Sequence, residues 1–180
     1  MGTKAKRIDA KTVSVIAVLT AVTTVLTLLV RIPFAPTRGY ITLADVGVYF
    51  AAFSFGPWVA FFAGGVGTGL ADAIAGYPQW MLFSFLIHGL QGLLAGLIAR
   101  NRPFPYMLAG WFVGLLVMVG GYFAAGSALY GIGPSLAEIP GNIGQNVAGA
   151  IVGIPLLFAV RKAYPPILNF GKPKSWQEVK

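Results

Sequence analysis

Long runs of apolar residues, separated by short polar or proline-containing stretches, dominate the sequence. A run of about 20 apolar residues is long enough to cross the hydrocarbon core of a bilayer as an α-helix. The pattern therefore predicts an all-α membrane protein, a single bundle of six transmembrane helices. The expected helices are about Thr12–Val30, Ile41–Phe55, Trp58–Ala75, Met81–Ala99, Phe104–Ala125 and, after a Gly-, Ser- and Pro-rich loop at 126–134, Leu136–Val160.

Lysine and arginine lie only at the ends of these runs, and their distribution predicts the topology. Six spans place both termini on one side of the membrane. With the termini inside, the outer side holds only Arg31 and Arg38, and the inner side holds Lys4, Lys6, Arg7, Lys11, Arg100, Arg102, Arg161, Lys162, Lys172, Lys174 and Lys180. This bias predicts cytoplasmic termini. We thus expect a basic cytoplasmic N-terminus at 1–11, a six-helix domain at 12–163 and a cytoplasmic tail at 164–180.

The composition supports this class and excludes several others. The chain has 180 residues, of which 57% are hydrophobic and 10% charged, as in multi-pass membrane proteins. It has no cysteine and one histidine, which excludes disulfides and argues against a zinc site. The net charge of +8 comes from the basic segment ends and does not indicate a nucleic-acid-binding face. We expect no metal, no cofactor and, without a Walker-type phosphate loop, no ATP hydrolysis by this chain.

Polar side chains interrupt the last apolar run with helical spacing. Glu138, Asn142, Gln145 and Asn146 stand at i, i+4, i+7 and i+8, which places them on one face of a helix. Acidic and amide groups inside a bilayer are costly and usually face the bundle interior or a water-filled cavity. The stripe therefore predicts one wall of a small-molecule pocket.

Further polar groups are expected at the same depth, near the outer side. Ser84, His88 and Gln91 share a face of the fourth helix, and Tyr122 lies in the outer half of the fifth. The outer loops add aromatic residues that could stack on a flat ring: Tyr40, Tyr77, Trp80 and Tyr130. Because Glu138 but no lysine or arginine is expected at this depth, the pocket favours a neutral or amine-bearing heterocycle, unless Arg31 or Arg38 folds over the site.

Each of these side chains also has a structural interpretation. His88, Asn142 and Asn146 could join helices by hydrogen bonds, and Glu138 could stabilise a helix N-terminus. Trp80 could belong to an interfacial aromatic belt. For Asp45 and Asp72, a structural ion pair with Arg31 or Arg38 is favoured over contact with a ligand.

The order of short motifs along the chain resembles the substrate-binding S components of energy-coupling-factor (ECF) vitamin transporters, in the branch annotated for riboflavin or hydroxymethylpyrimidine. The resemblance covers Thr12 to about Lys162. The motifs that carry it are Arg31-Ile32-Pro33, Gly39-Tyr40-Ile41-Thr42-Leu43-Ala44-Asp45, Phe55-Gly56-Pro57, Gly64-Gly65-Val66-Gly67, Ala71-Asp72-Ala73-Ile74-Ala75-Gly76-Tyr77 and His88-Gly89-Leu90-Gln91-Gly92.

The resemblance implies a six-helix bundle in a prokaryotic plasma membrane, with its pocket between helices four to six and the outer loops. It also implies partners: a transmembrane T subunit and two ATPase subunits. Ala17 and Ala21 match the A-x-x-x-A motif through which family members dock on the T subunit. Two other functions stay open from the sequence: a stand-alone carrier or channel using Glu138 or His88 as a proton relay, and a scaffold that binds no solute.

Overall fold

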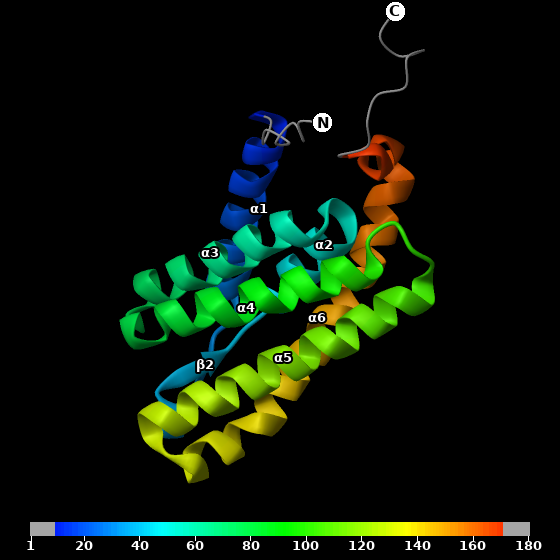
Figure 1. Ribbon diagram of the computed structural model, residues 1–180. Coiled ribbons are helices and arrows are strands. Elements are labelled where there is room, and N and C mark those ends of the chain that lie inside the picture. The colour runs from blue at the N-terminus through cyan, green and yellow to red at the C-terminus, as the bar shows by residue number, and fades with distance from the viewer. Residues whose placement is uncertain (1–9, 171–180) are drawn as a thin grey trace, which may run out of the picture.

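The computed structural model describes residues 10–170 and consists mainly of six helices (Figure 1). A short antiparallel hairpin with a 3-10 turn joins the first two, and another 3-10 helix follows the sixth. In chain order the elements are α1 (Ala10–Leu29), β1 (Ile32–Phe34), η1 (Ala35–Thr37), β2 (Gly39–Ile41), α2 (Ala44–Phe55), α3 (Pro57–Ala75), α4 (Pro78–Ala99), α5 (Phe104–Tyr130), α6 (Ile132–Ala163) and η2 (Pro165–Asn169).

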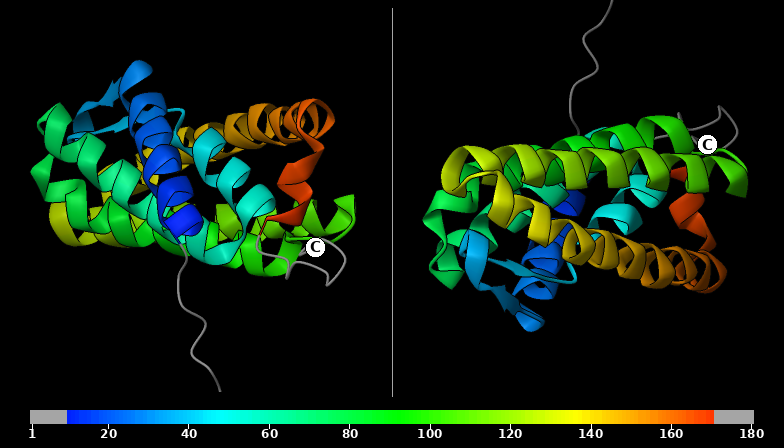
Figure 2. Two further views of the ribbon diagram at one scale, coloured as in Figure 1. Left: turned by 90° about the horizontal axis from the view of Figure 1, so that it is seen from above. Right: turned by 90° about the horizontal axis from the view of Figure 1, so that it is seen from below.

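The helices form one bundle in which α3, α4 and α5 lie side by side and α6 crosses behind them (Figures 1 and 2). The start of α1 and the end of α6 lie at the same end of the bundle (Figure 1). The hairpin, the α3–α4 turn and the α5–α6 turn lie at the opposite end (Figure 1). In the hairpin, Ile32 pairs with Ile41 and Phe34 with Gly39.

Two expected loops are wrong because helices continue through them. The stretch 126–134 was expected to be a loop, but α5 runs to Tyr130 and α6 begins at Ile132, so only Gly131 connects them. Pro134 is tolerated because the first N–H groups of a helix have no intrahelical acceptor. Likewise α4 begins at Pro78, which places Trp80 in its first turn and not in a loop.

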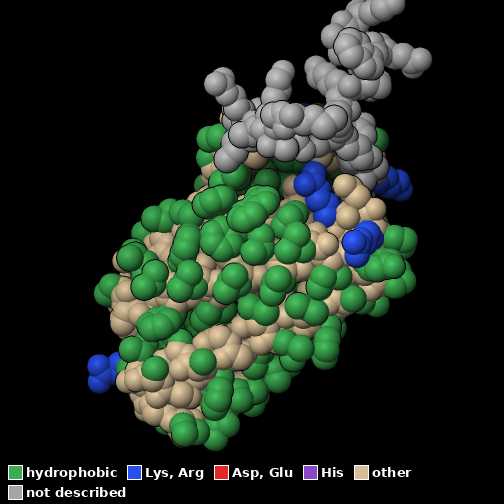
Figure 3. Space-filling model, viewed as in Figure 1, with side chains coloured by type: hydrophobic (Ala, Val, Ile, Leu, Met, Phe, Trp, Pro, Cys, Tyr) green, Lys and Arg blue, Asp and Glu red, His purple; other side chains and the backbone are tan. Residues whose placement is uncertain are grey.

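The second helix is shorter than expected. Ile41 belongs to strand β2, and α2 begins at Ala44 and has 12 residues, ten of them buried. Neighbouring helices enclose it, since α6, α3 and α4 all pack against it. Among the described residues, the other five helices are long and apolar enough to cross a membrane. On the face shown in Figure 3, apolar side chains cover the middle, and Lys and Arg side chains lie at the ends.

The described start of the expected tail packs against the bundle. Phe170 is buried, its ring meets Phe55 edge-on at 4.9 Å between centroids, and its carbonyl accepts a 2.6 Å hydrogen bond from Arg100. Segment 164–170 is therefore part of the folded domain. Most of the basic N-terminus, with Lys4, Lys6 and Arg7, and the end of the tail, with Lys172, Lys174 and Lys180, lie outside the described residues.

Candidate functional site

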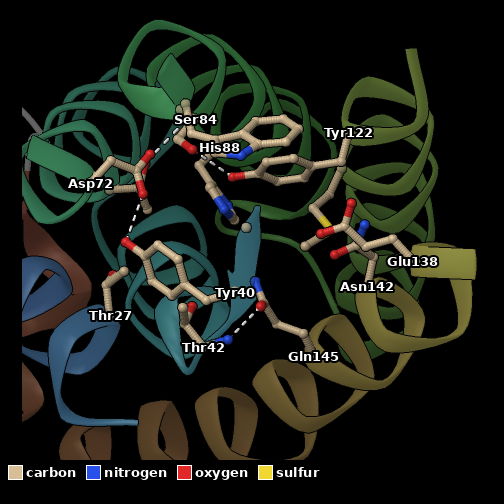
Figure 4. A pocket seen from close by; sticks show the side chains of 14 residues that line it. Thr27, Tyr40, Thr42, Asp72, Ser84, His88, Tyr122, Glu138, Asn142 and Gln145 are labelled. Carbon is tan, nitrogen blue, oxygen red and sulfur yellow. Dashed lines mark hydrogen bonds between the residues drawn. The ribbon is translucent and has the colours of Figure 1, made fainter. Parts of the chain in front are cut away.

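A small cavity lies between the hairpin, α3, α4, α5 and α6 (Figure 4). Its volume is about 30 Å³, within about 400 Å³ of space between the lining atoms that includes the part open to solvent. About 10–15 Å³ is enough for one water. The lining residues come from α1, β2, the turn after β2, and α3 to α6: Thr27, Gly39, Tyr40, Thr42, Thr68, Asp72, Trp80, Ser84, His88, Met118, Tyr122, Glu138, Asn142 and Gln145.

Hydrogen bonds between side chains of different elements shape one side of the cavity. The Tyr40 phenol donates to Asp72 Oδ1 at 2.6 Å, and the hydroxyls of Ser84 and Tyr122 share a 2.7 Å hydrogen bond (Figure 4). Burial, followed by the charge of Asp72, raises the pKa of the Tyr40 phenol well above its ordinary value. The phenol therefore keeps its proton and acts as a donor. The second oxygen of Asp72, Oδ2, is buried without a hydrogen-bond partner among the described residues.

Trp80 joins the hairpin to the helices. Its indole N–H lies 3.3 Å from the carbonyl oxygen of Thr37 and 3.2 Å from that of Arg38, and it donates to both. Its ring packs on Tyr122 and Tyr130, with centroids 5.6 and 6.0 Å away. Trp80 is only 3% exposed, so its interpretation as an interfacial belt residue is wrong.

The polar stripe of α6 faces the cavity from the other side. Glu138, Asn142 and Gln145 all line it and are all buried (Figure 4). Glu138 Oε2 has no hydrogen-bond partner among the described residues. Gln145 is held firmly, since its Oε1 accepts a 2.6 Å hydrogen bond from the Thr42 backbone N–H. The cavity thus presents two unpaired carboxylate oxygens and no lysine or arginine among its lining residues.

Under the cavity, three amide side chains converge on the carboxylate of Asp45. Gln91 and Asn146 donate to Oδ1, the latter at 3.0 Å, and Gln145 donates to Oδ2 at 2.7 Å. The approach of α6 requires a glycine at this point. A Cβ on Gly149 would lie 3.0 Å from the carbonyl carbon of Asp45 and would overlap its side chain.

Eight of the twelve side chains expected at the pocket line the cavity: Tyr40, Trp80, Ser84, His88, Tyr122, Glu138, Asn142 and Gln145. Four others do not. Tyr130 packs against the ring of Trp80, with 6.0 Å between centroids. Tyr77 packs against the ring of Tyr40, with 4.7 Å between centroids. Gln91 and Asn146 point to the expected side of their helices but bond to Asp45 under the cavity. A binding role for the eight stays a prediction.

The expected ion pairs of Asp45 and Asp72 are wrong. Within residues 10–170, neither carboxylate makes a salt bridge with Arg31 or Arg38; Asp45 accepts hydrogen bonds from amides, and Asp72 accepts one from Tyr40. Asp72 instead lines the cavity and was missed as a site residue. Thr27, Thr42, Thr68, Gly39 and Met118 were missed too, because nothing in a small or apolar residue on a long helix or in a hairpin signals a cavity.

The described residues offer no metal site, since no group of three or more His, Asp and Glu side chains within 10–170 could hold an ion. What the cavity offers is hydrogen bonding. It combines carboxylate oxygens, an imidazole, two amides and hydroxyls with aromatic rings, as in pockets that recognise small polar heterocycles.

Sequence comparison identifies the family. A family model described as "ECF-type riboflavin transporter, S component" matches residues 7–162. The thiamine precursor transporter HmpT of Lactococcus lactis subsp. cremoris (strain MG1363) is 42% identical over 143 residues, which are 79% of this chain and 82% of HmpT. An uncharacterised protein of Pyrococcus woesei is 42% identical over 147 residues, 81% of this chain and 99% of its own.

The fold agrees with that of a solved relative. A structure described as "Structure and mechanism of the S component of a bacterial ECF transporter" matches with a TM-score of 0.69 at 23% identity, covering 85% of this chain and 96% of the other. Members of this family are multi-pass membrane transport subunits and not enzymes. The long run of matched residues shows that the chain belongs to the family of S components of ECF-type riboflavin transporters.

Proposed function

We propose that the chain is the substrate-binding subunit of an ATP-driven ECF importer and captures a small amine-bearing heterocycle, a hydroxymethylpyrimidine-type thiamine precursor, from outside the cell. The observation that carries the proposal is the pair of unpaired carboxylate oxygens, Asp72 Oδ2 and Glu138 Oε2, on residues that line one cavity. Buried acceptors without donors are costly, and a guest that supplies N–H groups removes that cost.

The aromatic residues suit a flat guest. Trp80 and Tyr122 both line the cavity and their rings pack together, with 5.6 Å between centroids. Tyr40 lies across the cavity from Tyr122 (Figure 4). A ring placed between them would stack, while its amino group reaches a carboxylate and its ring nitrogens meet the amides of Asn142 and Gln145.

The size of the cavity favours a single ring over a flavin. With a cavity volume of about 30 Å³, any heterocycle must displace side chains to enter. A pyrimidine requires a smaller displacement than three fused rings that carry a sugar-like chain. The 42% identity to a transporter named for a thiamine precursor supports the same choice, whereas the family description names riboflavin.

The binding of an energising module is a separate part of the proposal. Ala17 and Ala21, four residues apart on α1, are both exposed. Small exposed residues at this spacing let another helix approach closely. We propose that the T subunit docks on this face of α1 and that two ATPase subunits supply the energy.

Two measurements test the proposal. Purified protein in detergent should bind 4-amino-5-hydroxymethyl-2-methylpyrimidine without nucleotide in isothermal titration calorimetry, and more weakly bind riboflavin. Asn142→Ala should weaken binding by about 1–3 kcal/mol, because the guest's partner is left unpaired. Exposed Gln79, which lies outside the cavity, provides the control Gln79→Ala. Equal affinity in both variants and the wild type would exclude this cavity as the site.

A stand-alone proton-coupled carrier is the second candidate, and the buried Glu138 and His88 beside one cavity favour it. Proteoliposomes that contain only this chain distinguish the two functions. Uptake driven by a proton gradient without partner subunits would support the carrier, and uptake only after addition of T and ATPase subunits with ATP would support the importer.

A further inference from the structure

Asp45 lies outside the cavity, yet it hydrogen-bonds to one lining residue, Gln145, and is connected through Gln91 to a second, His88. The carboxylate is fully buried, as are Gln91 and Asn146, and it receives an N–H from α4 and two from α6. A carboxylate without a proton only accepts hydrogen bonds. Each of the three amides must therefore turn its nitrogen toward Asp45 and its oxygen away from it.

For Gln145 and Asn146, the groups that contact the amide oxygen agree with that orientation. Gln145 Oε1 accepts from the Thr42 N–H, which can only donate, and Asn146 Oδ1 accepts from the Tyr49 hydroxyl at 2.9 Å. Amide orientation, which atomic positions alone leave ambiguous, is thus determined by the hydrogen-bond network. The hydrogen bonds within residues 10–170 use one of the two hydrogens on Gln145 Nε2, the one directed to Asp45, which leaves the second for a guest.

The third amide, that of Gln91, determines which nitrogen of the His88 ring carries hydrogen. Gln91 turns its Nε2 to Asp45, so its Oε1, an acceptor, meets His88 Nδ1 at 2.7 Å. This contact is a hydrogen bond only if Nδ1 carries a hydrogen. In a neutral imidazole, Nε2 then keeps a lone pair and is an acceptor. Among the hydrogen bonds of residues 10–170, none is made by His88 Nε2, and the ring points into the cavity (Figure 4).

We propose that Asp45 is a positioning residue that determines which guests the cavity accepts: by orienting Gln145 and, through Gln91, the His88 ring, it presents an N–H donor and an imidazole acceptor to the guest. An aminopyrimidine edge, with an amino donor beside a ring-nitrogen acceptor, complements this pair. The 4-oxo analogue reverses the edge to an acceptor beside a donor and does not. This inference rests on the proposed function for the identity of the guest. Its structural half, that Asp45 orients Gln145 and His88, concerns the protein alone.

The single histidine of the chain allows a direct test of the structural half. Protein labelled with ¹⁵N-histidine gives signals from one imidazole, whose two nitrogen shifts report which nitrogen carries hydrogen. At about pH 8.5, where an ordinary imidazole is neutral, wild-type protein should show a protonated Nδ1 and a bare Nε2. The opposite tautomer, or a ring protonated at both nitrogens, would overturn the proposal.

Asp45→Asn tests the role of the carboxylate with almost no change in volume. The new amide offers one oxygen and one NH2 group where the carboxylate offered two oxygens, so either Gln145 or the pair Gln91 and Asn146 loses its acceptor and must turn. We expect the His88 signals to shift toward the other tautomer or to split. Leu157→Ala controls for general destabilisation, because Leu157 is fully buried on α6 and is part of the apolar core. Its histidine signals should match those of the wild type. Unchanged histidine signals in Asp45→Asn would overturn the part of the proposal that runs through Gln91 to His88.

Binding provides the second readout. The ratio of the affinities for the 4-amino and 4-oxo pyrimidines should fall at least tenfold in Asp45→Asn and stay unchanged in Leu157→Ala. A ratio that survives in Asp45→Asn would refute the role of Asp45 in selectivity. Failure of the wild type to bind either pyrimidine would refute the proposed function instead. The nitrogen shifts of His88 would still show whether Asp45 orients the His88 ring through Gln91.

Discussion

Replacing Glu138 by glutamine should change stability and binding in opposite directions. Glu138 is 4% exposed and its Oε2 has no hydrogen-bond partner among the described residues. A buried carboxylate oxygen that no donor meets is costly to the folded protein. Glutamine keeps the shape and removes the charge, so we expect the free energy of unfolding to rise by roughly 1 kcal/mol or more.

The same substitution should weaken the binding of an amine-bearing guest. A hydrogen bond to a charged group contributes about 1.5–3 kcal/mol. Its loss corresponds to roughly a 10- to 150-fold increase in the dissociation constant. Calorimetry with the 4-amino pyrimidine measures the affinity, and thermal unfolding followed by tryptophan fluorescence measures the stability of the same preparation.

The 4-oxo pyrimidine is the matched control, because it lacks the amino group that Glu138 would contact. Its affinity should change little in Glu138→Gln. The reasoning fails if the variant binds the amino compound as tightly as the wild type, or if its melting temperature falls. A fall would mean that the carboxylate has a stabilising partner and that its buried oxygen is not unpaired.

Three further predictions concern other parts of the molecule. Gly149→Ala should lower the free energy of unfolding by about 1–3 kcal/mol in chemical denaturation, because its Cβ would overlap Asp45; no change would mean that α6 can move away from α2 at no cost. Trp80→Phe should speed dissociation of a bound pyrimidine in stopped-flow measurements, because the hairpin loses the indole N–H bonds to Thr37 and Arg38; equal rates would show that these bonds do not retain the guest. Ala21→Trp should abolish uptake with T and ATPase subunits while pyrimidine binding is kept; full uptake would move the docking face elsewhere on the chain.

The helices could be predicted from the sequence because the bilayer requires long apolar runs, and such runs are visible without any tertiary contact. Their ends were less certain. Gly126, Gly133 and Pro134 indicated a loop, but helical hydrogen bonds in α5 and α6 include all three positions. Glycine and proline mark loops in water more reliably than in a bundle where neighbouring helices determine the path.

In the candidate site, too, features of a single helix could be predicted from the sequence, and features that depend on tertiary packing could not. Helical spacing placed the side chains of α4 and α6 on the correct faces, because periodicity depends only on the helix itself. Depth was harder to predict: Gln91 and Asn146 bond to Asp45 outside the cavity, and Asp72 lines the cavity. The partners of Asp45 and Asp72 could not be derived, since the sequence offers arginines nearby and tertiary packing brings amides and a phenol instead.

The single-residue connection at Gly131 has a mechanical consequence. Its φ of 92° lies in the left-handed region, which glycine adopts readily, and it joins helices of 27 and 32 residues with no slack. With only Gly131 between them, α5 and α6 cannot move far apart at this end, and we expect a displacement of one helix to move the other as well. We therefore expect a guest to enter beside the hairpin, which lies at the same end of the bundle and is held to α4 by hydrogen bonds of Gln79 and Trp80.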